Sequence, residues 1–178
     1  AVESSFENLV GPRTRHGSEI SKAALEESDC VITVGSTLTA ISTNRWDLKI
    51  HNMIQFDIIP ENIGRHYPAK VGVVGDAKAG LRSLLDTLKA DGYQADPSYR
   101  NDIFARKAKW AENVFSGPIA DVNATPVPPI ALHMELSKCL KENSIFVVDA
   151  GNPGAWTHIT DFPAGTTYMK PVNYGNMG

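Results

Sequence analysis

The sequence predicts an α/β protein: a doubly wound, Rossmann-like domain with a parallel sheet, followed by the beginning of a second α/β domain. Short, continuously apolar runs occupy residues 30–35, 53–58 and 71–76, and such runs are typical of strands that are buried on both faces. Amphipathic helical segments precede and follow these runs, and a helix followed by a strand starts again near residue 129. Buried strands that alternate with amphipathic helices predict a parallel sheet with helices on both faces.

Each helix of the first domain carries its own start signal. Ser18 is a favourable N-cap for a helix that holds Glu19 in its first turn. Asp76 is the expected N-cap of a second helix, which ends near Gly92. The leucines of that second helix form one apolar stripe: Leu81, Leu84, Leu85 and Leu88.

Residues 93–125 are predicted to be a linker with one helix, because prolines and Gly117 surround a single helical stretch. We therefore assign residues 1–92 to the first domain and residues 126–178 to the start of the second, where Pro129 suits an early helical position. One strand and one loop cannot cover both faces of a parallel sheet. We expect that the second domain is truncated at its end and the first at its start.

The composition is that of an ordinary folded protein and argues against some classes of function. A formal charge of -3 without a cluster of Lys and Arg disfavours a nucleic-acid-binding protein. No apolar run approaches the roughly 18 residues of a membrane span, and no signal-peptide pattern opens the chain, so we expect a cytoplasmic protein without membrane contact. Cys30 and Cys139 lie in apolar segments and are predicted to be buried, reduced thiols.

Candidate ligand positions lie where the predicted strands end, because the crevice of an open parallel sheet lies outside the carboxyl ends of its strands. In the first domain these positions are Gly35, Asp57 and Asp76. An acidic residue at a strand end is well placed to accept a hydrogen bond from a ribose hydroxyl. The alternative is that Asp57 and Asp76 only cap the turns that follow them.

In the second domain, Gly151 and Asn152 stand at the mouth of a predicted strand. Glycine allows the backbone to approach a ligand closely, and the asparagine amide is a neutral donor, as a phosphate requires. The alternative is a plain β-turn over the sequence NPG, residues 152–154.

Other common site types are not indicated by the sequence. A P-loop and a strict GxGxxG are absent, so an ordinary ATPase or nicotinamide site is not expected. The histidines and cysteines lack metal-ligand spacing, and no serine lies in a nucleophile elbow. We therefore predict no metal ligand and no catalytic residue within this chain.

Several segments occur in an order and spacing that a known family shares. ESDCVITVGSTL, MIQFDIIPENIGRHYP and VGVVGDAKAGLRSLLDTL resemble the central domain of the thiamine diphosphate-dependent enzymes, the group of acetolactate synthase, pyruvate oxidase and the 2-oxoacid decarboxylases. Downstream, IFVVDAGNPGAW and YGNMG are similar to the opening of that family's diphosphate-binding domain. The resemblance covers residues 17–178.

The resemblance implies an enzyme that uses thiamine diphosphate and Mg²⁺ for carboligation or decarboxylation of 2-oxoacid substrates. It implies that Asn152 contacts the diphosphate, that Gly151 allows its approach, and that Met177 props the cofactor in its bent conformation. Pro153 departs from the histidine that many synthases carry at this position. The family's Mg²⁺ ligands and its activating glutamate match no residue of this chain, and the family implies a homodimer or homotetramer.

Some members of the family hold FAD or ADP in the central domain, along positions that match Gly35, Asp57 and Asp76. Thr37 replaces an arginine that is common in FAD-containing members, so a nucleotide domain that serves only as a spacer is an open alternative. The competing interpretation of the whole chain is a non-catalytic module that binds an adenine nucleotide.

Overall fold

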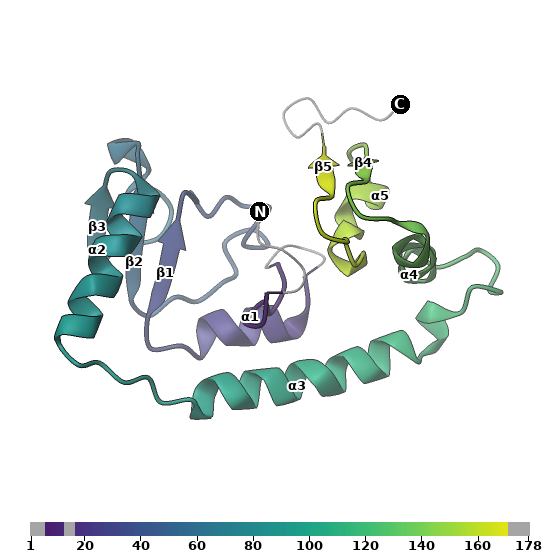
Figure 1. Cartoon of the computed structure of the whole chain (residues 1–178), viewed down its shortest axis with the longest axis horizontal. Helices are drawn as coiled ribbons and strands as arrows, with labels where there is room; N and C mark the ends of the chain where they lie inside the picture. The colour runs from purple at the N-terminus through teal and green to yellow at the C-terminus, as the bar shows by residue number, and fades with distance from the viewer. Residues whose placement is uncertain (1–5, 13–16, 171–178) are drawn as a thin grey trace. The chain divides into compact units, whose positions relative to one another are not determined.

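The structure is a computed structural model that describes residues 6–12 and 17–170 (Figure 1). It confirms the predicted α/β fold class, with parallel pairing in both of its sheets. None of the helices in these ranges is long and apolar enough to cross a bilayer.

The chain divides into two compact units. The first unit is residues 13–103, and the second combines residues 1–12 with residues 104–178. The division falls within helix α3 (Ser98–Phe115), inside the segment that the sequence predicts as a linker.

The first unit contains a parallel sheet in the order β1-β2-β3. Its strands are β1 (Val31–Val34), β2 (Met53–Asp57) and β3 (Val71–Val74), and a short 3-10 helix, η1 (Pro60–Asn62), follows β2. In the central strand, Phe56 lies opposite Val34 on one side and Val73 on the other. Each strand lies within one of the apolar runs, so the predicted strands are confirmed.

Both predicted helices of this unit are present: α1 (Glu19–Glu26) and α2 (Ala77–Ala90). Ser18 caps α1 by accepting a hydrogen bond from the backbone N–H of Ser21 (3.1 Å). Asp76 caps α2 by accepting one from the N–H of Ala79 (2.9 Å). The predicted N-caps are therefore confirmed, and each satisfies an N–H group that has no partner inside its helix.

Helix α2 packs closely on β2 (Figure 1). The ring of Phe56 would lie only 2.8 Å from a Cβ added at Gly80, so the glycine allows the close approach. The helix ends where the sequence predicts, with Gly92 at a φ of 66°. Only glycine adopts this left-handed conformation without a steric cost.

Burial differs between the central and the edge strands of this sheet. β2 is buried or half-buried throughout, whereas β1 and β3 carry apolar residues that are 39 to 57% exposed. These residues are Ile32, Val34, Val71 and Val74. In the described part of the unit, the expectation of strands buried on both faces is therefore wrong for β1 and β3, because they are the two edges of a narrow sheet.

The connection from β1 to β2 contains tight turns in place of a helix. Three consecutive residues, Asn44, Arg45 and Trp46, have positive φ angles of 52°, 63° and 62°. The buried Thr43 hydroxyl holds this turn, since it donates to the Thr39 carbonyl (2.9 Å) and accepts from the Trp46 N–H (3.0 Å). Residues other than glycine rarely adopt such angles, so the sequence pattern does not predict them.

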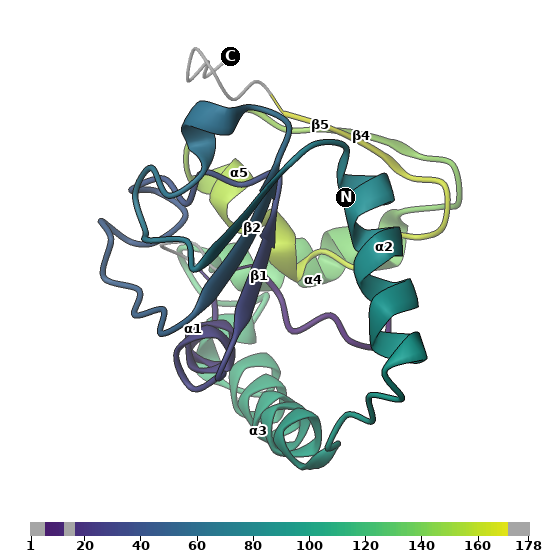
Figure 2. The ribbon, with the colours of Figure 1, turned by 90° about the vertical axis from the view of Figure 1, so that its left-hand side faces the viewer.

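The second unit contains a two-stranded parallel sheet, β4-β5 (Figure 2). Its elements after α3 are η2 (Pro118–Ala120), α4 (Pro129–Cys139), β4 (Ile145–Val147), α5 (Asn152–Ala155), η3 (Thr157–Ile159) and β5 (Thr167–Met169). Pro129 takes the first position of α4, as predicted. The rings of Phe146, Phe162 and Tyr168 lie 5.2 to 6.2 Å apart and form an aromatic cluster that includes one residue of each strand.

Both cysteines are free thiols, but neither is buried as predicted. Cys30 directly precedes the edge strand β1, and Cys139 is the last residue of α4. An apolar run indicates burial only for the residues inside an element that face the core, and both cysteines lie at the ends of their elements.

Candidate functional site

The predicted ligand positions of the first unit lie together at the carboxyl ends of its strands, which we call the carboxyl edge of the sheet. The Gly35 N–H donates to the Phe56 carbonyl (2.8 Å), and the Gly75 N–H donates to the Asp57 carbonyl (3.0 Å). Gly35, Asp57 and Asp76 therefore lie at the carboxyl ends of three adjacent parallel strands, as the sequence predicts. Both glycines have positive φ, 58° and 157°, and a Cβ added to either would meet nothing within 4 Å.

The carboxylates at this edge already hold the loops that follow them. Asp57 is 7% exposed, and it accepts hydrogen bonds from the Ile59 N–H (2.9 Å) and the Asn62 side-chain amide (3.2 Å). Asp76 accepts from the Ala79 N–H. Both side chains therefore perform the capping role that the sequence left as an alternative. A carboxylate has further lone pairs, so ribose recognition by Asp57 or Asp76 stays a prediction.

Gln55 is a residue of this edge that sequence reasoning missed. Its side chain is 2% exposed, and its amide forms three hydrogen bonds. Nε2 donates to the carbonyls of Ser36 (3.1 Å) and Asn62 (3.0 Å), and Oε1 accepts from the Gly64 N–H (2.8 Å). One amide thus ties the loop after β1 to the loop after β2. The signal in the sequence was an amide inside an apolar strand run, because a buried polar group needs partners.

The second candidate site is the loop between β4 and α5. Gly151 has a φ of 88° and ends the loop, and its carbonyl accepts a hydrogen bond from the Ala155 N–H (3.1 Å). Asn152 is exposed and begins α5, so the segment predicted as either a ligand loop or a β-turn is a single helical turn. Met177, the third predicted residue of this site, lies outside the described residues.

The loop is compact where it enters α5. Gly154 is buried, and a Cβ added there would lie 2.6 Å from the Asp149 carbonyl oxygen and 2.7 Å from both Cε and Nζ of Lys170. No side chain fits at this point, so the glycine is required by the close approach of its neighbours. Lys170 is a second residue that sequence reasoning missed, because it is distant from Gly154 along the chain.

His133 of α4 contacts the segment that follows the same loop. Its imidazole is 2% exposed, its Nδ1 lies 2.7 Å from the Thr160 hydroxyl, and it is hydrogen-bonded to the backbone of Pro153. Burial lowers the pKa of His133, the bond to Pro153 opposes that shift, and the nearby His158 lowers the pKa further. His133 is therefore neutral at pH 7 and connects α4 with both ends of the segment 153–160.

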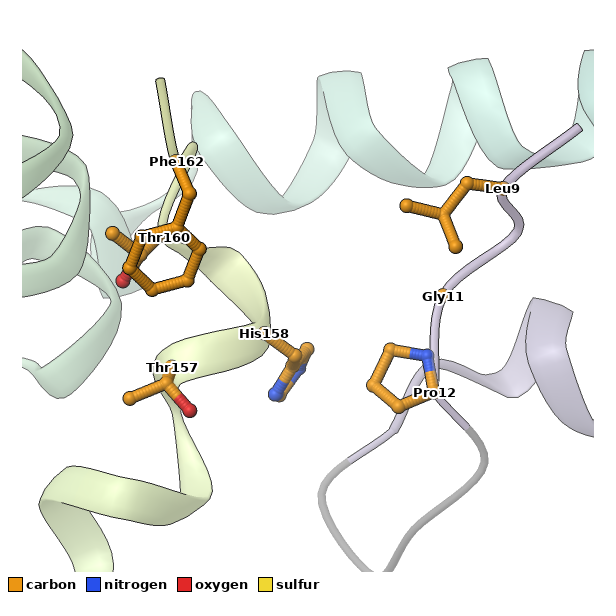
Figure 3. A pocket seen from close by; sticks show the side chains of 7 residues that line it. All are labelled: Leu9, Gly11, Pro12, Thr157, His158, Thr160 and Phe162. Carbon is orange, nitrogen blue, oxygen red and sulfur yellow. The ribbon is translucent and has the colours of Figure 1, made fainter. Parts of the chain in front are cut away.

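A separate cavity of about 370 Å³ lies in the second unit (Figure 3). It is lined by Leu9, Gly11, Pro12, Thr157, His158, Thr160 and Phe162. His158 points into it from η3, opposite Pro12, while its Nδ1 donates to the Ala155 carbonyl (3.0 Å). The Thr157 hydroxyl donates to the Gly154 carbonyl (3.0 Å). Polar groups that line the cavity thus already form hydrogen bonds within the protein. The described residues of the two candidate sites do not line it.

Metal ligation is not supported by the described part of the chain. Within residues 6–12 and 17–170, no group of three His, Cys, Asp or Glu side chains could hold a metal ion.

Residues 1–84 match the family described as "Thiamine pyrophosphate enzyme, central domain". The chain is 33% identical to a sulfoacetaldehyde acetyltransferase of Roseovarius nubinhibens, over 95% of this chain and 31% of the relative. It is 27% identical to a probable acetolactate synthase large subunit of Methanococcus aeolicus, over 92% of this chain and 29% of the relative. A third relative, the acetolactate synthase large subunit of Corynebacterium glutamicum, is 28% identical over 98% of this chain and 28% of its own length.

The chain thus spans about a third of the length of the curated relatives that it matches. The family match covers the sheet β1-β2-β3 with its carboxyl-edge residues Gly35, Asp57 and Asp76. The similarity to full-length relatives continues past this sheet into the second unit. The match thus identifies residues 1–84 as a central domain of the thiamine diphosphate-dependent enzyme family.

Proposed function

We propose that the protein to which this chain belongs is a thiamine diphosphate- and Mg²⁺-dependent enzyme that acts on 2-oxoacids, by acetolactate synthase-like carboligation or by decarboxylation. The observation that carries the proposal is the match of residues 1–84 to the family's central domain, together with relatives named acetolactate synthase. In this proposal, the chain contributes the central domain and the start of the diphosphate-binding domain.

The loop after β4 fits the cofactor's diphosphate. Gly151 and Asn152 are exposed, and Gly151 has a backbone conformation that a side chain would strain. At Gly154, neighbouring atoms leave no room for a side chain. Such a loop brings backbone and amide donors close to a phosphate. When bound, the cofactor supplies an electron sink for the carbanion that forms next to the substrate carbonyl.

The residues of this chain would bind and orient the diphosphate end. Gly151 lets the backbone turn at the end of the strand, and the Asn152 amide donates to a phosphate oxygen. His133 keeps the loop in place through Pro153 and Thr160. Met177 would support the bound cofactor, and we propose that the Mg²⁺ ligands would come from outside this chain.

The central-domain edge is proposed as the place where FAD or ADP binds, along Gly35, Asp57 and Asp76. The open space above Gly35 and Gly75 supports this proposal. We further propose a cytoplasmic homodimer or homotetramer, as the family resemblance implies.

A second candidate function is that of a sulfoacetaldehyde acetyltransferase, the name of one of the relatives. It is favoured by one observation: of two relatives with that name, one shares 33% identity with the chain and the other 28%, whereas two acetolactate synthases share 27 and 28%. In this proposal both functions would use the same cofactor site, and the choice of substrate distinguishes them.

Calorimetry and turnover of the full-length protein test the proposal. We expect saturable binding of thiamine diphosphate in the presence of Mg²⁺ and cofactor-dependent consumption of a 2-oxoacid such as pyruvate. Sulfoacetaldehyde as a second substrate separates the two candidate reactions. Binding of ADP or FAD without any binding of thiamine diphosphate would overturn the enzyme proposal in favour of the nucleotide-binding module.

A further inference from the structure

A lysine side chain lies over the loop that is proposed to hold the diphosphate. Lys170 directly follows β5, whose last residue, Met169, lies opposite Val147 of β4. The pairing is parallel and continues as a hydrogen bond from the Val148 N–H to the Met169 carbonyl (3.1 Å). Lys170 and the loop after β4 therefore leave the sheet at the same edge.

The side chain of Lys170 folds back onto that loop. Its Cε and Nζ both lie 2.7 Å from the point where a Cβ of Gly154 would stand. Gly154 is two residues after Asn152 and three after Gly151, so the ammonium group lies against the loop that carries both proposed diphosphate contacts.

No ion pair among the described residues neutralises the charge of Lys170. The residue is half-buried, and within the described ranges of the chain Lys170 forms no ion pair. A partly buried cation without a counter-ion has lost some hydration without gaining a partner. An anionic ligand at this loop would supply the missing charge.

We infer that Lys170 is a cofactor-binding residue whose ammonium group contacts the diphosphate held by the loop after β4. This inference rests on the proposed function. Gly151 and Asn152 offer only neutral donors, whereas a diphosphate carries several negative charges at neutral pH. Hydrogen bonds from a charged donor are about twice as strong as neutral ones, so a lysine adds what the neutral donors lack.

The competing role for Lys170 is structural. Its aliphatic stem covers Gly154, and a lysine can pack in this way without binding any ligand. A methionine at position 170 keeps most of that packing and removes the charge, whereas an arginine keeps the charge. The two substitutions therefore separate the electrostatic role from the packing role.

The test is calorimetry of the full-length protein with thiamine diphosphate and Mg²⁺, at low and high salt. We expect Lys170→Met to raise the dissociation constant roughly 10- to 100-fold, as is typical for a lost hydrogen bond to a charged group, and Lys170→Arg to change it less than about threefold. Affinity should also depend less on salt in Lys170→Met than in the wild type. The matched control is Lys141→Met, since Lys141 is exposed in the loop after α4.

The outcomes distinguish the inference from the proposed function. If the wild type binds no thiamine diphosphate, both are wrong. If the wild type binds and Lys170→Met binds equally well with the same salt dependence, the proposed function stands and the role of Lys170 is only structural. The melting temperature of the ligand-free variants shows whether they fold, and Lys170→Gln replaces the methionine variant if it does not.

Discussion

The two candidate sites differ in what their polar groups already do. At the edge of β1-β2-β3, Gln55, Asp57 and Asp76 form hydrogen bonds with the loops around them. In the loop after β4, Asn152 is exposed and Lys170 has no ion-pair partner among the described residues. Satisfied polar groups stabilise a loop, whereas unsatisfied ones are free to bind a ligand. The first site is therefore held by its own hydrogen bonds, and the second offers donors to a ligand.

The largest expected effect comes from breaking the amide that holds the first site. Gln55→Leu removes three hydrogen bonds, those to the Ser36 and Asn62 carbonyls and the one from the Gly64 N–H, although the Asn62 carbonyl keeps its bond from the Arg65 N–H (3.3 Å). At about 1 kcal/mol for each lost bond, we expect the free energy of unfolding to fall by roughly 3 kcal/mol. Urea denaturation of the full-length protein measures this loss.

The control for this change is Gln94→Leu, because Gln94 is exposed. We expect it to alter stability by less than about 0.5 kcal/mol. If Gln55→Leu lowers the free energy of unfolding by less than about 1 kcal/mol, other contacts hold these loops. The first site would then not depend on the hydrogen bonds of Gln55, which contradicts the comparison of the two sites.

The second prediction concerns the loop after β4. Gly151→Ala places a side chain at a φ of 88°, which costs about 1 to 3 kcal/mol in the native loop. We expect the loop to shift and the affinity for thiamine diphosphate to fall by roughly 10- to 100-fold. Gly92→Ala is the matched control, since Gly92 also has a positive φ of 66° but ends α2 in the other unit. Equal affinities in both variants would refute the role of Gly151.

The third prediction uses the pH dependence of stability. Burial lowers the pKa of His133, so the unfolded chain binds a proton at this residue more readily than the native protein. The contribution of neutral His133 is complete above its unfolded pKa of about 6.5 and is lost as the pH falls towards the lower native pKa. We expect the free energy of unfolding to decrease more steeply between about pH 7 and 5 in the wild type than in His133→Gln.

Chemical denaturation at several pH values measures this difference. The control is His51→Gln, because His51 is exposed. Parallel curves for the wild type and His133→Gln would show that His133 does not couple protonation to folding.

The sequence predicts most of the elements but few of the contacts between distant residues. The strands and the caps at Ser18 and Asp76 depend on local patterns, and the structure confirms them. The bonds of Gln55 and the approach of Lys170 to Gly154 join separate loops, so no local pattern contains them. The sequence predicts burial less well, because an apolar run is buried in the central strand and partly exposed in the edge strands.

The positive φ angles at Asn44, Arg45 and Trp46 were likewise not predictable. They are held by Thr43, whose hydroxyl bridges two backbone groups from a fully buried position. A threonine in a polar stretch carries no signal of its own for such a role. The residues at the carboxyl ends of strands could be predicted, because parallel pairing alone brings these ends together.

The smallest expected effect tests whether the first site binds a ligand at all. Asp57→Ala removes a carboxylate at the central-domain edge. We expect the affinity for ADP to fall about 3- to 10-fold, as for one hydrogen bond of about 1 kcal/mol, because this carboxylate already accepts two hydrogen bonds from the protein. The affinity for thiamine diphosphate should not change, because Asp57 and the loop after β4 belong to different units. Calorimetry of the full-length protein with each ligand measures both affinities. Asp86→Ala, a change at an exposed residue of α2, is the control.

Equal loss of affinity for both ligands in Asp57→Ala would contradict the separation of the two sites. If ADP binds neither the variants nor the wild type, the hydrogen bonds of Asp57 serve only to hold the loop after β2. The central domain is then a spacer, and the side chains at the carboxyl ends of its strands stabilise their own loops.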